Sequence, residues 1–271
     1  MGLFRTARDP SIRGLFLFGY AMQDLSKVRK IEARSLNAWP TLQEILYDGW
    51  VLRFADGFTH RSNSINPIYE GSQGVFEKTL ACEDIYKERD LCPVFKISPL
   101  VHPRDLDEIL EGRGYEKEAT TSVQSLNLNI FEISSTPQTG VAENACATWL
   151  EDYEKLQTMD DQEKRCFALI LCQTAARIFY LSLQENGKMV AAGLSILEGD
   201  HVGLYGLITD SDHRGKGIDK EMVVNVLCHA RKLGANLAYL QVLMKNDPAL
   251  QLYSRLGFRE CYRYWYRTIQ N

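Results

Sequence analysis

Helical and strand-like spacings of apolar residues alternate along the second half of this chain. Over residues 218–233 the apolar positions recur with a period near 3.6, so one face of a helix carries Ile218, Met222, Val226, Leu227, Ala230 and Leu233. Gly234 stands where helices commonly end, and the apolar run 238–243 that follows predicts a strand. Asp247 as N-cap and Pro248 at the first position then predict a further helix. Strands and helices in this alternation indicate an α+β protein.

The rest of the chain shows the same two spacings. Helices are predicted from about residue 23 onward, in the aromatic-rich segment around Trp149, and over residues 162–179. Asn186-Gly187 separates two strand-like runs and predicts a hairpin between them. The segment 261–267 alternates as a strand, with tyrosines on one face and arginines with a tryptophan on the other, and it is predicted to complete a sheet.

This pattern repeats at an offset of 143 residues. Gly74 stands 143 residues before Gly217, and Gly114 stands 143 residues before Gly257. The same offset pairs two helices and two strands without a gap: 76–89 with 219–232, and 95–98 with 238–241. A tandem of two related folds follows from the shared register. The predicted organisation is an N-terminal extension over 1–22, a first half over 23–133, a linker over 134–140 and a second half over 141–271.

The most informative chemistry lies in the loop Asp212-His213-Arg214-Gly215-Lys216-Gly217-Ile218, between a predicted strand and a predicted helix. Two glycines one residue apart allow backbone N–H groups to converge on an anion, and the helix start adds unpaired amides and a positive dipole end. The loop is not a triphosphate-binding P-loop, because no Ser or Thr follows Lys216 to hold magnesium. The loop is also not a dinucleotide-binding fingerprint, because that motif would need a third glycine.

The loop and the residues after it resemble the acetyl-CoA-binding half of the GNAT superfamily of acyltransferases. Arg-Gly-Lys-Gly-Ile at 214–218 is followed by Asn246, Ala249, Leu252-Tyr253 and Gly257-Phe258, and the resemblance covers roughly residues 185–260. It implies two tandem GNAT-like domains, each a mixed, mostly antiparallel sheet flanked by helices. It also implies acetyl-CoA as co-substrate, with no metal.

The resemblance further implies roles for individual residues. Tyr253 would protonate the departing thiolate, although a half-buried core tyrosine is the simpler alternative. Asn246 would hold the pantetheine arm, or it could be a turn residue. Asp212 and Asp219 depart from the family pattern by placing acids beside an anion site. The implied coenzyme-binding residues are Leu207, Ile208, Thr209, His213, Arg214, Gly215, Lys216, Gly217, Ile218 and Asn246.

The first half lacks the groups that carry this chemistry. Ser72-Gln73 stands where the second half has Gly215-Lys216, and Glu70-Gly71 stands in place of His213-Arg214. Leu110 occupies the position of Tyr253. We therefore expect the first half to be a degenerate copy that binds no coenzyme A and shapes the acceptor pocket.

The general base and the acceptor site are less well marked. His201, Tyr205 and Asp210 lie on or beside the strand that leads into the loop and are candidate bases, each with an alternative as a turn, core or surface residue. Candidate acceptor-pocket residues in the first half are Trp50, Arg53, Arg61, Asn63 and Asn66. Turns at Asp48-Gly49 and Asp56-Gly57 bracket a predicted hairpin there, whose polar side chains could simply face water.

Composition narrows the functional classes. The 271 residues carry a net charge of −4, which gives no reason to expect nucleic acid as a partner. Seven cysteines without Cys-x-x-Cys or zinc spacing suggest reduced thiols and a cytoplasmic protein. The apolar stretch 14–20 is too short to span a membrane, so no membrane partner is expected, and Met1-Gly2 with Thr6 matches the myristoylation pattern by a short motif alone.

The function expected from these observations is transfer of an acetyl group to a primary amine of a small molecule or to an exposed amino group of a peptide. The alternative is an acyl-CoA-binding sensor or scaffold without chemistry. The oligomeric state is left open by the sequence.

Overall fold

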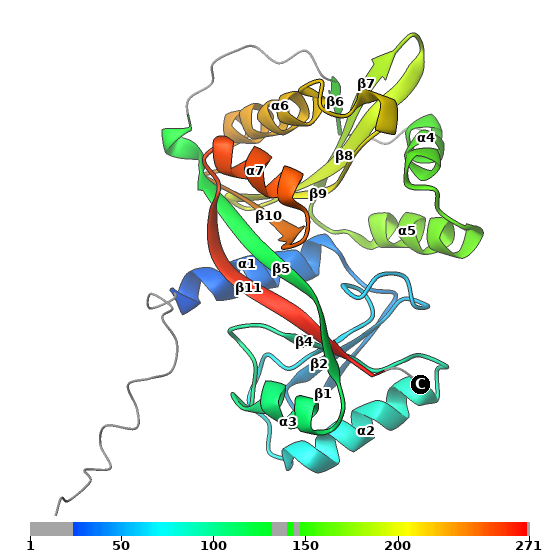
Figure 1. The fold of residues 1–271 in the computed structure, drawn as a ribbon, viewed down its shortest axis with the longest axis vertical. Helices are drawn as coiled ribbons and strands as arrows, with labels where there is room; N and C mark the ends of the chain where they lie inside the picture. The colour runs from blue at the N-terminus through cyan, green and yellow to red at the C-terminus, as the bar shows by residue number, and fades with distance from the viewer. Residues whose placement is uncertain (1–23, 132–139, 144–146, 270–271) are drawn as a thin grey trace, which may run out of the picture.

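The computed structural model describes residues 24–131, 140–143 and 147–269 (Figure 1). The predicted extension 1–22 and residues 134–139 of the predicted linker lie outside the described residues. Gly140, the last residue of that linker, begins a strand. The division into domains at 133 and 141 remains a prediction.

The first half contains α1 (Leu25–Ala38), β1 (Gln43–Tyr47), β2 (Trp50–Phe54), β3 (Ile65–Asn66), α2 (Val75–Lys87), β4 (Val94–Ile97), α3 (Leu106–Gly112), β5 (Glu116–Asn127) and the 3₁₀ turn η2 (Leu128–Ile130). The second half contains β6 (Gly140–Ala142), α4 (Ala147–Gln157), α5 (Asp161–Gln173), β7 (Arg177–Glu185), β8 (Lys188–Glu198), β9 (His201–Thr209), η3 (Ser211–His213), α6 (Ile218–Lys232), β10 (Leu237–Leu243), α7 (Asp247–Arg255) and β11 (Arg259–Thr268).

Both halves present their elements in the same order. α1 to β5 reads helix, three strands, helix, strand, helix, strand, and α5 to β11 reads the same. The equivalent pairs α2 and α6, β4 and β10, and α3 and α7 follow the 143-residue offset seen in the sequence. The second half has β6 and α4 in addition, ahead of the shared order.

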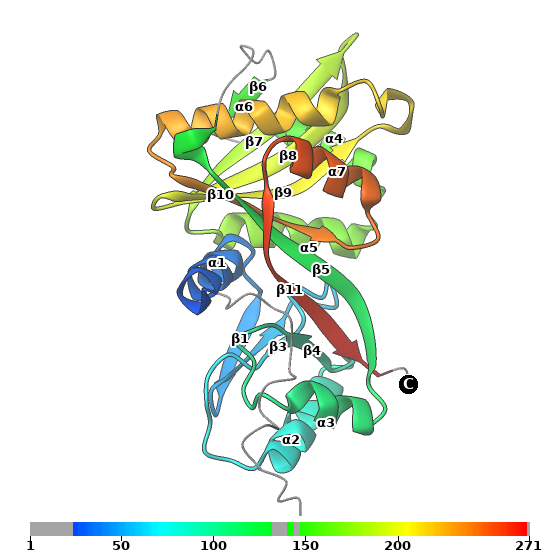
Figure 2. The same cartoon turned by 60° about the vertical axis from the view of Figure 1, so that its left-hand side comes forward.

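The strands of the described residues join one mixed, mostly antiparallel 11-stranded sheet, in the order β1-β2-β3-β4-β11-β5-β10-β9-β8-β7-β6. The last strand of each half lies in the other half: β5 pairs with β10, and β11 pairs with β4. β5 and β11 also pair with each other and run side by side through the middle of the molecule (Figures 1 and 2). The two halves are thus joined by exchange of their C-terminal strands.

Local sequence explains most element boundaries. Asp48-Gly49 and Asn186-Gly187 both have positive φ angles and form two-residue hairpin turns, β1–β2 and β7–β8. The second was predicted, whereas the hairpin expected between Asp48-Gly49 and Asp56-Gly57 instead has its turn at Asp48-Gly49. Asp160 closes a capping box with Glu163 at the start of α5. The prediction of a helix over 162–179 was wrong at its end. α5 stops at Gln173 because Thr174 leaves the helical conformation, and the alternating residues after it form β7.

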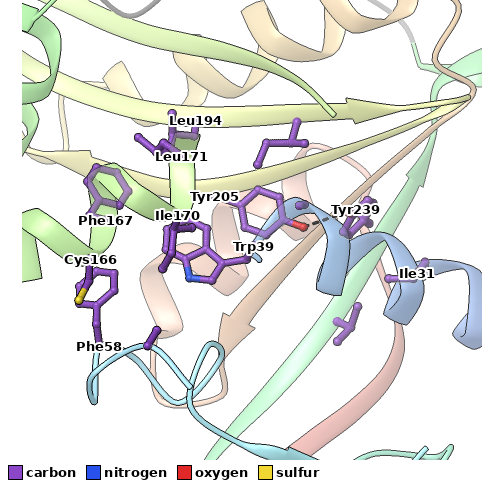
Figure 3. Close-up of a cluster of buried hydrophobic side chains, with 14 of the residues drawn as sticks. Ile31, Trp39, Phe58, Cys166, Phe167, Ile170, Leu171, Leu194, Tyr205 and Tyr239 are labelled. Carbon is purple, nitrogen blue, oxygen red and sulfur yellow. Dashed lines mark hydrogen bonds between the residues drawn. The ribbon is translucent and has the colours of Figure 1, made fainter. Parts of the chain in front are cut away.

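Helices cover both faces of the sheet and form three apolar clusters. α6 and α7 pack on one face of the second half, and α2 and α3 pack on the first half. α1, α4 and α5 lie together on the opposite face of the second half, in a cluster that also takes residues from the first half. Figure 3 shows this inter-half cluster, where Trp39 and Phe58 of the first half meet Phe167 of α5 and Tyr205 of β9.

Candidate active site

β9 and β10 run parallel and pair over only part of their length. Their register begins at His201 with Leu237 and ends at Leu204 with Leu240, although β9 continues to Thr209 and β10 to Leu243. Gly206, with φ of 54°, forms a bulge in β9 at the point where the strands separate. Beyond it, the β9 edge that faces β10 has backbone groups without partners in β10. Such an edge can pair with an extended, amide-containing ligand.

The predicted pantetheine-binding residues lie on this diverging part of β9. The side chain of Leu207 packs into the α6–α7 cluster, and that of Ile208 packs on the opposite face. Thr209 is buried at the strand end, and its hydroxyl donates to Asp219 Oδ1. Asp219, an acid that the sequence analysis noted beside the predicted anion site, therefore accepts a hydrogen bond from the end of β9.

The loop after β9 leaves its backbone donors available. Gly215 and Gly217 have φ of 76° and 85°, a conformation that favours glycine, and Gly217 is the N-cap of α6. Within the described residues, no hydrogen bond uses the backbone N–H of Gly215, Lys216 or Gly217. The first amides of α6, from Ile218 on, add to this group. The loop can therefore hold a phosphate through several N–H groups.

The side chains of the loop have different surroundings. His213 is held by two carboxylates, with Nε2 2.7 Å from Glu185 Oε2 and Nδ1 3.0 Å from Asp210 Oδ1. Its ring thus links the β7–β8 turn to the loop. The His213 side chain therefore has a structural role. Arg214 is exposed and donates from Nε to the carbonyl of Thr209, while Lys216 is exposed.

The equivalent loop of the first half is already filled by a carboxylate. Asp48, in the β1–β2 turn, accepts from the backbone N–H of Ser72 (2.8 Å) and of Gln73 (3.0 Å). Lys78 Nζ lies 3.1 Å from the same carboxylate. These hydrogen bonds hold the pKa of Asp48 well below its usual range. Ser72 and Gln73 correspond to Gly215 and Lys216, so Asp48 occupies the donors that remain available in the second half.

Tyr253 lies on α7, where it is 9% exposed and packs edge-on against Phe258 with ring centres 5.7 Å apart. Its ring is part of the apolar cluster under α6 and α7, as the core alternative expected. Its hydroxyl has no hydrogen-bond partner in the described part of the chain. Burial, and secondarily the charge of Asp219, raise the pKa of Tyr253 to about 12. The hydroxyl is therefore protonated near neutral pH and can donate.

Asn246 has a structural function in the turn between β10 and α7. Its side-chain oxygen accepts from the N–H of Ala249 at 3.3 Å, so Asn246 rather than Asp247 is the N-cap of α7. The side-chain amide remains exposed at the open ends of β9 and β10. A contact from this amide to the pantetheine arm remains a prediction.

Comparison with known families agrees with this geometry. The family described as "Probable histone acetyltransferase Rv0428c C-terminal" matches residues 25–267, nearly the whole chain. The chain belongs to this family. It is also similar to the "Uncharacterized N-acetyltransferase YobR" of Bacillus subtilis, with 25% identity over 249 residues that cover 90% of this chain and 99% of that protein.

Solved structures of GNAT proteins share the fold. A GCN5-related N-acetyltransferase from Kribbella flavida superposes with a TM-score of 0.69 at 15% identity and covers 93% of this chain and 97% of its own. A tandem GNAT protein from the clavulanic acid biosynthesis pathway gives a TM-score of 0.58 at 12% identity, over 72% of this chain and 69% of its own. The chain is a CoA-dependent N-acetyltransferase of the GNAT superfamily.

Of the candidate bases named from the sequence, Tyr205 and Asp210 flank the diverging part of β9, and His201 lies at the far end of that strand. His201 begins β9 and binds Asp200 at 2.7 Å, about 26 Å from the loop for a strand of this length. The hydrogen bond from His213, followed by that from the Asp212 N–H, lowers the pKa of Asp210. Burial raises the pKa of Tyr205 to about 12, which makes it a poor proton acceptor near neutral pH.

Four of the five candidate acceptor residues have structural functions. Trp50 lies in the first-half core and donates to the carbonyl of His102. Arg53 is buried and donates to backbone carbonyls, among them that of Trp39 at 2.5 Å. Asn63 accepts from the N–H of Ala55, and Asn66 donates to Ser64, so both stabilise the β2–β3 connection. Arg61 alone among the five projects into the inter-half cluster.

The structure adds a titratable pair that the sequence did not single out. His60 Nε2 lies 2.6 Å from Glu118 Oε1, and both side chains are nearly half exposed. The His60 ring centre is 5.1 Å from that of Tyr266. His60 and Glu118 are 58 positions apart, so no local motif could have indicated their contact.

Within residues 24–131, 140–143 and 147–269, no group of His, Cys, Asp or Glu side chains is arranged to hold a metal ion. Among the helices of the same residues, none has the length and apolarity that a membrane span requires.

Proposed function

We propose that the protein transfers an acetyl group from acetyl-CoA to a primary amine, and that the second half carries the reaction. The observation that supports this most is the contrast between the loops. The amides at 215–217 are available beside an opened β9–β10 pair, whereas Asp48 fills the equivalent amides of the first half. The first half is accordingly proposed to bind no coenzyme A.

The proposed division of labour follows from the chain's own groups. The amides of Gly215, Lys216 and Gly217 bind the pyrophosphate, and Arg214 and Lys216 contribute positive charge from exposed positions. The open edge of β9 binds the amide-containing arm and directs a backbone N–H at the thioester carbonyl. The Tyr253 hydroxyl donates a proton to the thiolate as the C–S bond breaks.

The amine must lose a proton to become a nucleophile, since a free alkylamine has a pKa of about 10. His60, oriented by Glu118, is the proposed acceptor of this proton, through a bound water. His60→Gln should lower turnover by roughly 10²-fold without changing acetyl-CoA affinity. The rate should be measured against pH, because loss of a proton-accepting side chain changes the pH dependence of turnover. An unchanged pH profile would exclude His60.

A panel of amines tests the proposed reaction on the full chain. Release of free CoA that depends on both acetyl-CoA and an amine, with an acetylated product found by mass spectrometry, is the expected result. Tight acetyl-CoA binding without transfer to any amine or amino-terminal peptide would instead favour the sensor or scaffold, whose one supporting observation is that Tyr253 is packed as a core residue.

A further inference from the structure

We infer that the acceptor amine carries a carboxylate, which pairs with Arg61. This inference rests on the proposed function and specifies its substrate class. Arg61 belongs to the first half, but its guanidinium carbon lies 5.5 Å from the ring centre of Trp39 and 5.5 Å from that of Tyr205 on β9. The next residue along β9 is Gly206, where the strand parts from β10. Arg61 is therefore placed beside the opening where acyl transfer is proposed.

The position of Arg61 depends on the joining of the two halves. Strand β11 pairs with β5 so that Tyr266 stands opposite Glu118 and Tyr264 opposite Thr121, and Thr121 in turn pairs with Leu243 at the end of β10. The Arg61 guanidinium interacts electrostatically with these two tyrosines and with Tyr205, and its side chain is hydrogen-bonded to Tyr264. Arg61 thus lies among neutral hydroxyl groups at the same end of the sheet as the open strands.

The charge of Arg61 lacks a compensating anion. Among the described residues, no carboxylate forms an ion pair with it, and its side-chain hydrogen bond goes to the neutral Tyr264. Its Nε is shielded from water without a hydrogen-bond partner, as are those of Arg53 and Arg113. A guanidinium removed from water is costly unless it is paired.

Other shielded arginines of this fold are compensated. Arg267 Nε lies 2.7 Å from Asp107 Oδ1, and Arg113 lies 2.7 Å from Glu83 Oε1. Arg53 donates to three backbone carbonyls. Arg61 differs from them by having no carboxylate partner among the described residues, and it lies beside the opening where the second substrate is proposed to bind. The missing anion is therefore assigned to that substrate.

A single guanidinium is suited to a monoanion. Its planar fork binds a carboxylate through two parallel N–H···O contacts. The Tyr264 hydroxyl donates to Gln241 Oε1 and the Tyr205 hydroxyl pairs with that of Tyr239, so the guanidinium supplies the contacts to the anion. The nearby Arg53 donates to three backbone carbonyls, and its Nε lies 3.7 Å from Glu44 Oε2, so its charge is already compensated. A carboxylate is therefore favoured over a dianionic phosphate.

Pairs of amine acceptors that differ in the carboxylate test this directly, with acetyl-CoA as donor. The pairs are alanine with alaninamide, phenylalanine with phenylalaninamide, and 4-aminobutyrate with butylamine. Phosphoethanolamine is added as an amine that carries a phosphate instead. In at least one pair the parent should show a higher kcat/KM for the acid. Arg61→Gln should lower that value by roughly 10²-fold, mainly through KM, and should change the uncharged partner less than about threefold, as expected for loss of a shielded charge pair. Arg61→Lys should retain part of the preference.

Arg89→Gln is the matched control, because Arg89 also stands over an aromatic ring of the first half, that of Phe54 at 4.7 Å, but is exposed. It should behave as the parent, and melting curves identify any variant that unfolds. Equal kcat/KM within every pair, an equal loss for all acceptors in Arg61→Gln, or a preference for phosphoethanolamine would overturn the inference.

Failure of the proposed function gives a different result: no CoA release from the parent with any acceptor. The carboxylate inference is then decided by calorimetry with the same acids in the presence of CoA. Binding to the parent that Arg61→Gln and not Arg89→Gln abolishes would support it, and binding that is absent or unaffected by Arg61→Gln would contradict it.

Discussion

The two strand-to-helix loops of this protein share a position in the fold but differ in what meets their amides. In the first half, the β1–β2 turn brings Asp48 onto the N–H groups of Ser72 and Gln73. In the second half, the β7–β8 turn brings Glu185 onto the ring of His213. One turn carboxylate fills the anion site, and the other is held away from it by a histidine. We propose that a single contact from a neighbouring hairpin decides whether such a loop can accept an external phosphate.

The two halves also differ at equivalent positions of helices α7 and α3. α7 carries Tyr253, whose hydroxyl has no partner among the residues that the structure describes, whereas α3 carries the fully buried Leu110 at the equivalent position. The first half has kept its fold and its packing. Its proposed contribution to the reaction is the group of side chains, Arg61 and His60, that it presents to the opening of the second half.

The largest expected effect is that of removing the Tyr253 hydroxyl. Tyr253→Phe should lower kcat by roughly 10²- to 10⁴-fold while acetyl-CoA affinity stays nearly constant, because the hydroxyl acts mainly in the transition state and the ring still packs on Phe258. Steady-state kinetics, acetyl-CoA titration and a melting curve should be obtained on one preparation. Leu110→Met is the control in the first half and should leave kcat unchanged. Full activity of Tyr253→Phe would show that Tyr253 is a core residue and not the proton donor.

A matched pair of glycine substitutions should separate the two loops. Gly217→Val should weaken acetyl-CoA binding by roughly tenfold or more, since a β-branched residue disfavours the positive φ that presents the amides. Gly74→Val, at the equivalent N-cap where φ is −60°, should leave affinity unchanged. Isothermal titration of both variants checks this. Equal affinity of Gly217→Val and the parent would mean that the loop serves as a turn.

A smaller effect is expected from the pH dependence that Asp48 contributes. Its pKa is lowered in the folded protein, so its stabilisation is present above the unfolded value of about 3.9 and is lost as pH falls below it. Asp48→Asn should melt below the parent near neutral pH, and the difference should shrink as pH falls below about 4. Melting temperatures across that range measure it. A difference independent of pH would show that the charge of Asp48 is not what stabilises the loop.

The sequence predicted the loop, the tandem repeat and the helix of Tyr253, because glycine pairs, caps and a fixed offset are local signals. It did not predict the exchange of β5 and β11. A period of two shows that 261–267 forms a strand but does not show which strand it pairs with. The Asp48 contact, the His60–Glu118 pair and the position of Arg61 depend on that pairing or on side-chain geometry. For the same reason, Trp50, Arg53, Asn63 and Asn66 could not be separated from Arg61 before the fold was known.

The central claim is that coenzyme A binds to the second half alone. Calorimetric titration of the full chain with CoA tests it most directly. The account predicts one site per chain in the parent, one site in Gly74→Val, and a site in Gly217→Val that is weakened or lost. Two sites per chain, or one site that Gly74→Val weakens and Gly217→Val leaves intact, would contradict it.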